Sequence, residues 1–354
     1  MPSIYQKSPK PLNTPKKKQA FLDRQWMKAM RDWLAAEQCE KAERLRATRE
    51  LFGEPVTIFD PHTHSDYSDG RATIAQNRDA GLRAGIDVVF AADHNSLTQK
   101  RSVKGVPSMS WGQEPQAGNH HIGLLHNSRR LYPRKDGTEK DFDRARKLAP
   151  FTWIPHPAGW FTKDYSEERK NDLWKLGPAF AMEVINGAKR IHRAFERHDA
   201  EAVELWDRLL TDSIRVTPLA GSDAHLPEAI GNCWTAIPKE DATAESIIAY
   251  LNNGRCLASE SPLLTMEVKG QPMGNSIDAA ENQKLRVKYR VADAAGLQSL
   301  GFVADGISLQ KIYTHDQPLV EDEWEFTYAG QNYIRLEVRA CDDLRAFSAP
   351  VYFD

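Results

Sequence analysis

The fold class is decided by the stretch Asp60-Pro61-His62-Thr63-His64-Ser65-Asp66-Tyr67-Ser68-Asp69-Gly70, which directly follows the apolar run Val56–Phe59. Residues i and i+2 at the end of a β-strand point to the same face of the sheet. His62 and His64 can therefore converge on one metal ion. Two histidines at this spacing also occur by chance, so the prediction of a metal site depends on where other ligands fall.

Other histidines and carboxylates lie mostly at or just after the ends of further short apolar runs. They are Asp93 and His94 after Val88–Ala92, Glu114 after Ser108–Gly112, His121 before Ile122–Leu125, His156 after Phe151–Ile154, and Asp223 and His225 after Val216–Ala220. The runs alternate with helical patterns such as Thr73–Gly85 and Arg190–Leu210, which predicts βα units and a parallel sheet or barrel. Because side chains at the carboxyl ends of barrel strands converge, we expect these residues to form one site.

The ligand types narrow the choice of metal. Imidazole and carboxylate groups without thiolates favour Mn²⁺, Zn²⁺ or Fe²⁺. A structural zinc site is closed by four ligands, whereas His62, His64, Asp69, His94, Glu114, His121, His156, Asp223 and His225 are all candidates here. This set is too large for one ion, so we expect two or three divalent metal ions.

Five segments together resemble the motifs of the PHP (polymerase and histidinol phosphatase) family over roughly residues 56–257. They are His62-Thr63-His64…Ser68-Asp69-Gly70, Ala92-Asp93-His94-Asn95, Gly112-Gln113-Glu114, His156-Pro157 and Gly221-Ser222-Asp223-Ala224-His225. The resemblance implies a distorted (β/α)7 barrel with metals at its carboxyl-terminal rim. It also implies three ligand sets: His62, His64, Glu114 and Asp223; then Asp69, His94 and His225; then the shared Glu114 with His121 and His156.

The activity that the resemblance implies is hydrolysis of a phosphate ester, either a small phosphoester or a nucleotide, by metal-activated hydroxide. Asp223 is the candidate for orienting the attacking water, and Asp223 or His225 for passing a proton to the leaving group. His120 and His121 are adjacent, and His121 is favoured as the ligand because it directly precedes an apolar run.

Other residues are expected to support this chemistry. Asp93 resembles a carboxylate that fixes the tautomer of a neighbouring histidine, with a turn or N-cap role as the alternative. Glu183 resembles a motif carboxylate that is not a ligand, so we expect a structural role for it. Lys189 and Arg190 follow the run Ala181–Ile185 and are candidates for binding an anionic substrate, with a solvated loop as the alternative.

The remaining parts of the chain predict two further units. Residues 1–55 are expected to form a proline-rich arm and an amphipathic helix from Lys16 to about Phe52. Two roles are open for this helix: contact of its basic residues with nucleic acid or another partner, and packing on the main domain or a homo-oligomer mate. Residues 56–257 form the barrel. Residues 258–354 show short alternating runs separated by turn residues, which predicts an antiparallel β-sandwich. The segments Asn253-Gly254-Arg255, Ser261-Pro262-Leu263-Leu264 and Pro272-Met273-Gly274 resemble a PHP branch with such a domain, which includes carbaryl-hydrolase-like enzymes.

Composition limits the partners. The net charge of −2 gives no general case for nucleic acid or an anionic membrane. The four cysteines are scattered, and no run has the length of a signal peptide or membrane span, so we expect a cytoplasmic protein. The expected partner is a small-molecule or nucleotide substrate.

Two alternatives to a phosphoesterase remain open. A carbamate or carboxyl-ester hydrolase could use the same metal-activated hydroxide, because fold alone does not select the substrate. The other is a non-catalytic scaffold in which the β domain binds a partner. The full set of candidate ligands argues against the scaffold.

Overall fold

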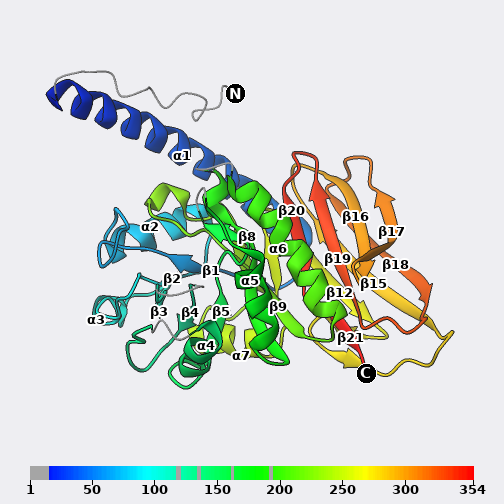
Figure 1. Ribbon diagram of the computed structural model, residues 1–354. Helices are drawn as coiled ribbons and strands as arrows, with labels where there is room; N and C mark the ends of the chain where they lie inside the picture. The colour runs from blue at the N-terminus through cyan, green and yellow to red at the C-terminus, as the bar shows by residue number, and fades with distance from the viewer. Residues whose placement is uncertain (1–15, 117–120, 134–136, 161–162, 191–193) are drawn as a thin grey trace.

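The structure is a computed structural model that describes residues 16–116, 121–133, 137–160, 163–190 and 194–354. The side chains of residues 16–24, 189, 190, 194 and 195 lie outside this description. The chain has a long N-terminal helix, an α/β part and a large C-terminal region of antiparallel strands (Figure 1). This arrangement confirms the predicted α/β class, the N-terminal helix and the antiparallel C-terminal strands, while the predicted boundaries after residues 55 and 257 stay predictions.

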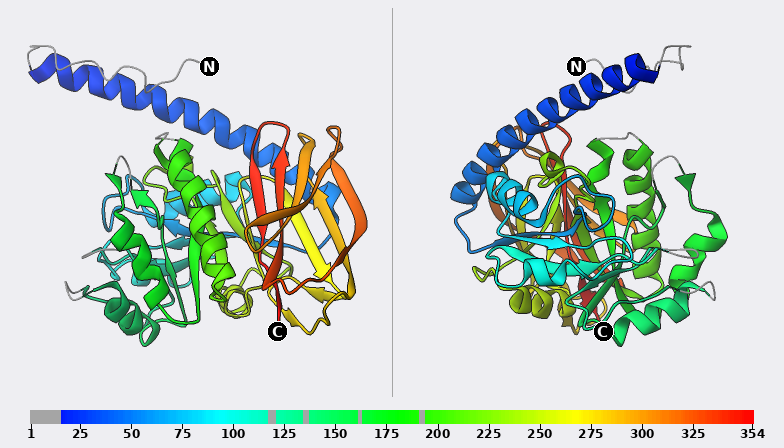
Figure 2. Two further views of the ribbon diagram at one scale, coloured as in Figure 1. Left: turned by 45° about the vertical axis from the view of Figure 1, so that its right-hand side comes forward. Right: turned by 90° about the vertical axis from the view of Figure 1, so that its left-hand side faces the viewer.

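Helix α1 (Lys16–Phe52) begins and ends where the sequence predicts. Phe52 is buried in a core cluster that also contains side chains of the C-terminal strands. Further along the helix, Met30 and Leu34 pack on Leu226 of the α/β part. The N-terminal end of the helix extends beyond the α/β part (Figure 2). The helix thus packs on the main body of the protein, and its predicted contact with a second copy stays a prediction.

Seven strands of the α/β part lie side by side in the order β1-β2-β3-β4-β5-β8-β9. They are β1 (Thr57–Thr63), β2 (Val88–Ala91), β3 (Met109–Gln113), β4 (Gly123–Leu125), β5 (Phe151–Ile154), β8 (Ala179–Asn186) and β9 (Arg215–Gly221). Neighbouring strands are parallel except at β4, which runs antiparallel to β3 and β5. An isolated parallel bridge joins Thr63 to Ala224, so the residues after β9 return to the end of β1.

Helices connect most of these strands. Thr73 and Gln76 form a capping box at the start of α2 (Ile74–Ala84), and Gly85 ends it with a left-handed φ of 80°. The other helices are α3 (Lys100–Val103), α4 (Thr138–Arg146), α5 (Glu167–Asn171), η1 (Asp172–Lys175), η2 (Gly187–Arg190), α6 (Ala194–Thr211), η3 (Pro227–Ala229) and α7 (Ala244–Asn252). A hairpin of β6 (Gly159–Trp160) and β7 (Lys163–Asp164) follows β5. None of the helices in the described ranges combines the length and apolar character needed to cross a membrane.

The C-terminal strands continue the same sheet. β10 (Trp234–Ile237) pairs with β1, and β11 (Leu257–Ser259) pairs with both β10 and β20 (Arg345–Ser348). The sheet then includes β14 (Ser276–Ile277), β16 (Leu297–Ala304), β17 (Ile307–Tyr313), β19 (Tyr333–Ala340) and β21 (Val351–Phe353). A second sheet contains β12 (Leu263–Val268), β13 (Gln271–Pro272), β15 (Lys284–Ala292) and β18 (Leu319–Thr327).

Aromatic side chains link these two C-terminal sheets. The ring of Phe302 on β16 stacks on Trp324 of β18 with centroids 4.7 Å apart, and Tyr289 of β15 lies edge-on to Phe302 at 5.2 Å. Such ring pairs add to the energy of burying apolar surface. The C-terminal region is therefore held to itself by an apolar core and to the α/β part by main-chain hydrogen bonds.

Candidate metal centre

Four candidate ligand atoms lie close together in the interior of the protein. They belong to residues in or directly after β1, β3 and β9. The Nε2 atoms of His62 and His64 are 3.2 Å apart. Glu114 Oε2 lies 3.2 and 3.4 Å from these two nitrogens, and Asp223 Oδ1 lies 3.5 and 3.1 Å from them. Ligand atoms bound tetrahedrally to one ion at about 2.1 Å are roughly 3.4 Å apart. The ligand atoms of His62, His64 and Glu114 thus lie close enough together to hold one ion, and Asp223 Oδ1 approaches the same two histidine nitrogens from its own side.

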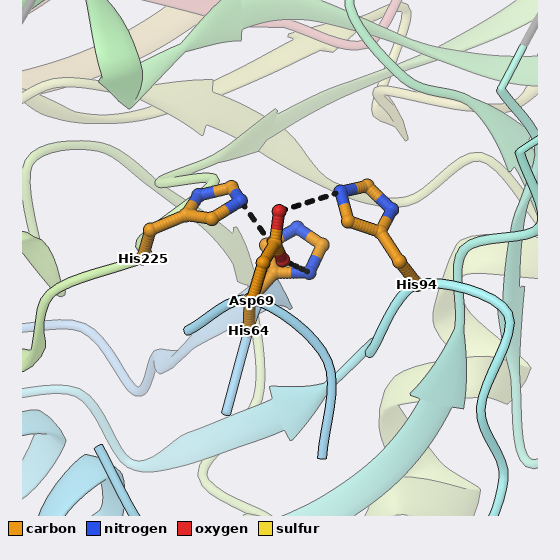
Figure 3. Close-up of side chains that lie close together, drawn as sticks. All are labelled: His64, Asp69, His94 and His225. Atoms are coloured by element: carbon orange, nitrogen blue, oxygen red, sulfur yellow. Dashed lines mark ion pairs between the residues drawn. The ribbon is translucent and has the colours of Figure 1, made fainter. Parts of the chain in front are cut away.

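A second group of side chains surrounds Asp69 (Figure 3). Its carboxylate oxygens lie 3.3 Å from His225 Nε2, 3.8 Å from His94 Nε2 and 4.0 Å from His64 Nδ1. The rings of His94 and His225 lie on either side of His64, each with its centroid 4.3 Å from that of His64. His64 is therefore shared between the first group and this one.

Glu114 joins the first group to a third. Its Oε1 atom lies 2.7 Å from His121 Nδ1 and 3.2 Å from His156 Nε2, while Oε2 lies 2.8 Å from His94 Nδ1. His121 can reach this point because β4 is antiparallel, so the start of β4 lies at the same edge of the sheet as the ends of its parallel neighbours. His120 lies outside the described residues. The structure thus brings all nine predicted ligands into one contiguous cluster.

Three atoms of the cluster are buried without a hydrogen bond. In the described part of the chain, Glu114 Oε2, His64 Nδ1 and His94 Nδ1 have no hydrogen-bond partner. Burying a polar atom without a partner is costly, and such exceptions are rare in native proteins. A cation bound among these ligands would satisfy Glu114 Oε2, so the residues present fit a metal centre.

Glu183 orients the first group. Its Oε1 atom accepts a hydrogen bond from His62 Nδ1 at 2.7 Å and another from Trp153 Nε1 at 3.3 Å. Its Oε2 atom accepts from the backbone N–H of His156 at 3.0 Å and from Asn186 Nδ2 at 3.1 Å. Because the Nδ1 proton of His62 points to Glu183, the lone pair on Nε2 faces the centre, as a metal ligand requires. The structural role expected for Glu183 is therefore to fix a ligand.

Asp93 has the contacts of the turn role that the sequence left open as the alternative to fixing a histidine tautomer. Its carboxylate accepts hydrogen bonds of 2.7 Å from the Ser65 backbone N–H, the Ser65 hydroxyl and the Ser68 hydroxyl. Its contacts therefore hold the turn that leads to Asp69, whereas the side-chain hydrogen bond of His94 Nε2 is with Gln116 at 3.0 Å.

The charges in the cluster suit a cation. Burial disfavours ionisation of Glu114, but His94, His62 and His121 outweigh it and hold its pKa well below the usual value. Asp223 is likewise buried, and the nearby His62 and His64 lower its pKa. Burial, together with His225 and His94, lowers the pKa of His64 to about 3. Near neutral pH the two carboxylates are thus ionised and His64 is neutral, which are the states that bind metal.

Backbone strain marks two residues of the centre. His156 has a φ of 29° and Asp223 a φ of 49°, and residues other than glycine rarely adopt positive φ. Such conformations persist where the surrounding contacts enforce them, and they are concentrated at functional sites. The strain therefore agrees with a functional role for the residues that follow β5 and β9.

The predicted substrate-binding residues are only partly described. Lys189 and Arg190 lie in η2, directly after β8, but their side chains are outside the described residues. The wall next to His121 and His156 is aromatic. The Trp160 ring centroid lies 6.2 Å from that of His121, and the Tyr165 hydroxyl lies 3.4 Å from His156 Nδ1. Sequence reasoning did not assign Tyr165, which carries no motif signal.

Gly70 should be intolerant of any side chain. A Cβ atom there would lie 2.4 Å from the carbonyl oxygen of His64 and 2.7 Å from the backbone nitrogen of Ser65. Backbone atoms cannot move without displacing both the end of β1 and Asp69, so we expect Gly70→Ala to lower the free energy of unfolding by about 1–3 kcal/mol.

Denaturant unfolding would measure this change. Gly301→Ala is the matched control, because its Cβ would be 3.4 Å from the flexible Glu337 side chain, and it should change stability by less than about 0.5 kcal/mol. Equal stability of the Gly70→Ala variant and the wild type would contradict the expectation.

Comparisons with known proteins bear on the same region. Residues 210–256, which include Asp223 and His225, match a family model described as PHP-associated. A similar solved structure is a two-domain protein from Bacteroides vulgatus containing a predicted PHP-like metal-dependent phosphoesterase, with 17% identity, coverage of 85% of this chain and 96% of that chain, and a TM-score of 0.44. Another is PsfC from Pseudomonas syringae, with 18% identity, coverage of 55% and 88%, and a TM-score of 0.40. No curated protein sequence gives a match. The resemblance to the carbaryl-hydrolase-like branch stays a prediction.

Proposed function

We propose that this protein is a PHP-type metal-dependent phosphoesterase that hydrolyses a small phosphoester or a nucleotide. The proposal rests on one observation: the ligand atoms of His62, His64 and Glu114 all lie within 4.8 Å of one another, and Asp223 Oδ1 lies 3.1 and 3.5 Å from the same two histidine nitrogens. The adjoining groups around Asp69 and around His121 support a centre of two or three ions. The family-model match over residues 210–256 supports the PHP assignment.

The proposed fold of the catalytic part is the distorted (β/α)7 barrel. Seven strands in unbroken order, and the bridge from Thr63 to Ala224, support closure of the sheet on itself. In such a barrel the active site lies at the carboxyl ends of the strands, where the ligands are found.

The proposed chemistry divides between the ions and the chain. Bound divalent ions would lower the pKa of water and neutralise charge on a transferring phosphoryl group. Asp223 would orient the attacking water, because it is buried and its carboxylate points into the centre. His225 has a side chain that is 32% exposed, so it is the better placed of the two to pass a proton to a leaving group near the opening.

A second candidate function is hydrolysis of a carbamate or carboxyl ester at the same centre. The aromatic wall of Trp160 and Tyr165 beside His121 and His156 favours this candidate. An uncharged ester or carbamate with an apolar group would gain from contact with the exposed ring of Trp160.

Three chromogenic substrates would test these candidates: a phosphomonoester, a phosphodiester and a carboxyl or carbamate ester. The purified protein should hydrolyse a phosphate ester with added Mn²⁺ and lose that activity with a chelator. The ratio of monoester to diester turnover would distinguish a phosphatase from a nuclease. Turnover of the ester alone would replace the proposal with the second candidate. No turnover of any substrate by metal-loaded protein would favour the non-catalytic scaffold.

Metal affinity should increase with pH. Asp69 and Asp223 outweigh burial and raise the pKa of His225 to about 9 in the metal-free protein, and Glu183, Asp223 and Glu114 raise that of His62. His225 is therefore protonated near pH 7, the pKa of His62 is shifted in the same direction, and a ligand nitrogen must lose its proton to bind metal. Between pH 6.5 and 8.5 we expect the Mn²⁺ association constant to rise roughly tenfold per pH unit for each proton displaced.

Isothermal titration calorimetry in two buffers of different protonation enthalpy would measure both the affinity and the protons released. Above about pH 9, His225 is already deprotonated in the metal-free protein. Its contribution to the pH dependence of Mn²⁺ affinity should therefore level off. A pH-independent affinity with no proton release would show that these two rings do not bind the metal.

A further inference from the structure

The ring of His156 has different groups on its two nitrogens. Its Nε2 atom faces Glu114 Oε1 at 3.2 Å, and its Nδ1 atom lies 3.4 Å from the hydroxyl oxygen of Tyr165. The His156 side chain is only 1% exposed, so bulk water does not serve Nδ1. Among the described residues, Nδ1 has no hydrogen-bond partner besides this hydroxyl. The tautomer of His156 therefore depends on Tyr165.

The Tyr165 hydroxyl favours the tautomer that binds metal. A histidine that binds a cation through Nε2 carries its proton on Nδ1, and a buried N–H needs an acceptor. The phenol oxygen of Tyr165 can accept that hydrogen bond. The separation of 3.4 Å is long for such a bond. A cation on Nε2 would strengthen it, because electron withdrawal from the ring makes the Nδ1–H a better donor.

Tyr165 is held in place by its ring and its backbone. It directly precedes Ser166, the N-cap of α5, and its backbone N–H donates to the carbonyl oxygen of Ala158 at 3.0 Å. The Tyr165 side chain is buried, and the guanidinium of Arg169 lies over its ring at 3.2 Å from the centroid. Arg169 also interacts with the hydroxyl, but a guanidinium has only donors and cannot accept the Nδ1 proton of His156. No partner of Tyr165 in this group therefore replaces its hydroxyl as the acceptor.

We propose that Tyr165 is a positioning residue for the third ligand group, the one around Glu114 Oε1, and that it acts through the ring of His156. Its hydroxyl does for His156 what the Glu183 carboxylate does for His62. In each pair the partner accepts the Nδ1 proton and so turns the Nε2 lone pair toward the centre. Without the hydroxyl, the buried Nδ1–H loses its acceptor and this tautomer becomes less favourable. The inference rests on the proposed metal centre.

The test compares Tyr165→Phe with the wild-type full-length protein by Mn²⁺ calorimetry. Phenylalanine keeps the ring that packs beside His156 and under Arg169, and it removes only the hydroxyl. Loss of a residue that orients a metal ligand typically weakens metal binding 10–100-fold. We expect one Mn²⁺ site to become about tenfold weaker and the other sites to change less than about twofold. Tyr313→Phe is the matched control and should equal the wild type, because it removes the same hydroxyl at an exposed position on β17.

Steady-state kinetics distinguishes positioning from direct contact with the substrate. At limiting Mn²⁺, Tyr165→Phe should turn over substrate about tenfold more slowly than the wild type. At saturating Mn²⁺ its kcat should return to within about twofold, because His156 still offers Nε2 to the ion. A low kcat that excess Mn²⁺ does not restore, in a variant with wild-type Mn²⁺ affinity, would overturn the inference.

A double-mutant cycle tests the route through His156. In a His156→Ala background the ligand that Tyr165 positions is absent, so adding Tyr165→Phe should change Mn²⁺ affinity by less than about twofold. A further tenfold loss in the double variant would overturn this route. If Tyr165→Phe does not fold, ¹⁵N NMR of the wild-type protein loaded with Zn²⁺ decides the case. The imidazole shifts of His156 should show its proton on Nδ1, and a proton on Nε2 would overturn the inference.

The outcomes separate the inference from the proposed function. Wild-type Mn²⁺ affinity at every site in folded Tyr165→Phe would overturn the inference and leave the metal centre standing. Failure of the wild-type protein itself to bind Mn²⁺ would overturn both. Mn²⁺ binding without hydrolysis of any phosphate ester would overturn the proposed function alone, because the affinity measurement does not depend on turnover.

Discussion

Glu114→Gln should remove most of the metal from the purified protein and lower the rate of hydrolysis by more than about 100-fold. This decrease is larger than the 10–100-fold decrease typical when a residue that only supports a metal ligand is replaced. Glu114 is buried, and its two oxygens face ring nitrogens in all three ligand groups, from His62 on one side to His156 on the other. Glutamine has the same shape but no charge, and its amide nitrogen must replace one of the two oxygens. Whichever side receives that nitrogen presents hydrogens where a cation needs a lone pair.

Metal content after purification, measured by mass spectrometry, would check the first part of this prediction. Hydrolysis with saturating Mn²⁺ would check the second. Glu325→Gln makes the same chemical change at an exposed position on β18 and should leave both values unchanged. Full metal content in Glu114→Gln would mean that the three groups do not share this carboxylate.

Parts of the fold that depend on local pattern were predictable from the sequence. The run Phe151–Ile154 is a strand with the predicted bounds, and the runs Val88–Ala92 and Val216–Ala220 match β2 and β9 to within one residue at each end. Helix α2 occupies the predicted segment because Thr73 and Gly85 are residues whose chemistry starts and stops a helix. Continuous apolar runs and capping residues therefore provided reliable local signals in this chain.

The direction of β4 and the existence of β10 were not predicted. β4 has only three residues, and an apolar run does not encode strand direction. That direction nevertheless explains His121: it precedes its strand while the other ligands follow theirs, and only an antiparallel strand brings its start to the shared edge. β10 begins at Trp234 with four residues, too few for a clear alternation.

The clustering of the candidate ligands was predictable from the sequence, whereas their supporting contacts were not. Histidines and carboxylates after successive strands are visible as a pattern because strand ends share one edge. The hydrogen bonds of Asp93 to Ser65 and of Asn186 to Glu183 depend on rotamers and loop paths, which no spacing rule encodes. The residues around a ligand set therefore have to be read from the structure.

Asp223→Asn should lower kcat by about 10²–10⁴-fold, the range that a positioned acid or base contributes, while Mn²⁺ binding falls less. His62, His64 and Glu114 still provide ligand atoms for the first group. The charge of Asp223 is lost, however, and its Oδ1 faces His64 Nε2 at 3.1 Å while Oδ2 faces Asn186 Nδ2 at 3.4 Å. An amide nitrogen in place of Oδ1 presents hydrogens where the first group needs a lone pair, and one in place of Oδ2 meets the Asn186 amide, which needs an acceptor, so the side chain can no longer orient a water for attack.

Steady-state kinetics at saturating Mn²⁺, with metal content measured in parallel, would separate loss of turnover from loss of metal. Asp66→Asn is the matched control, because it makes the same chemical change at an exposed carboxylate in the segment after β1, and it should retain activity within about twofold. Near-full activity of metal-loaded Asp223→Asn would show that the water is oriented by another group. His225 would then be the first candidate for orienting the water. It lies in the same segment as Asp223, and its Nδ1 atom donates to the Asp223 carbonyl oxygen at 2.9 Å.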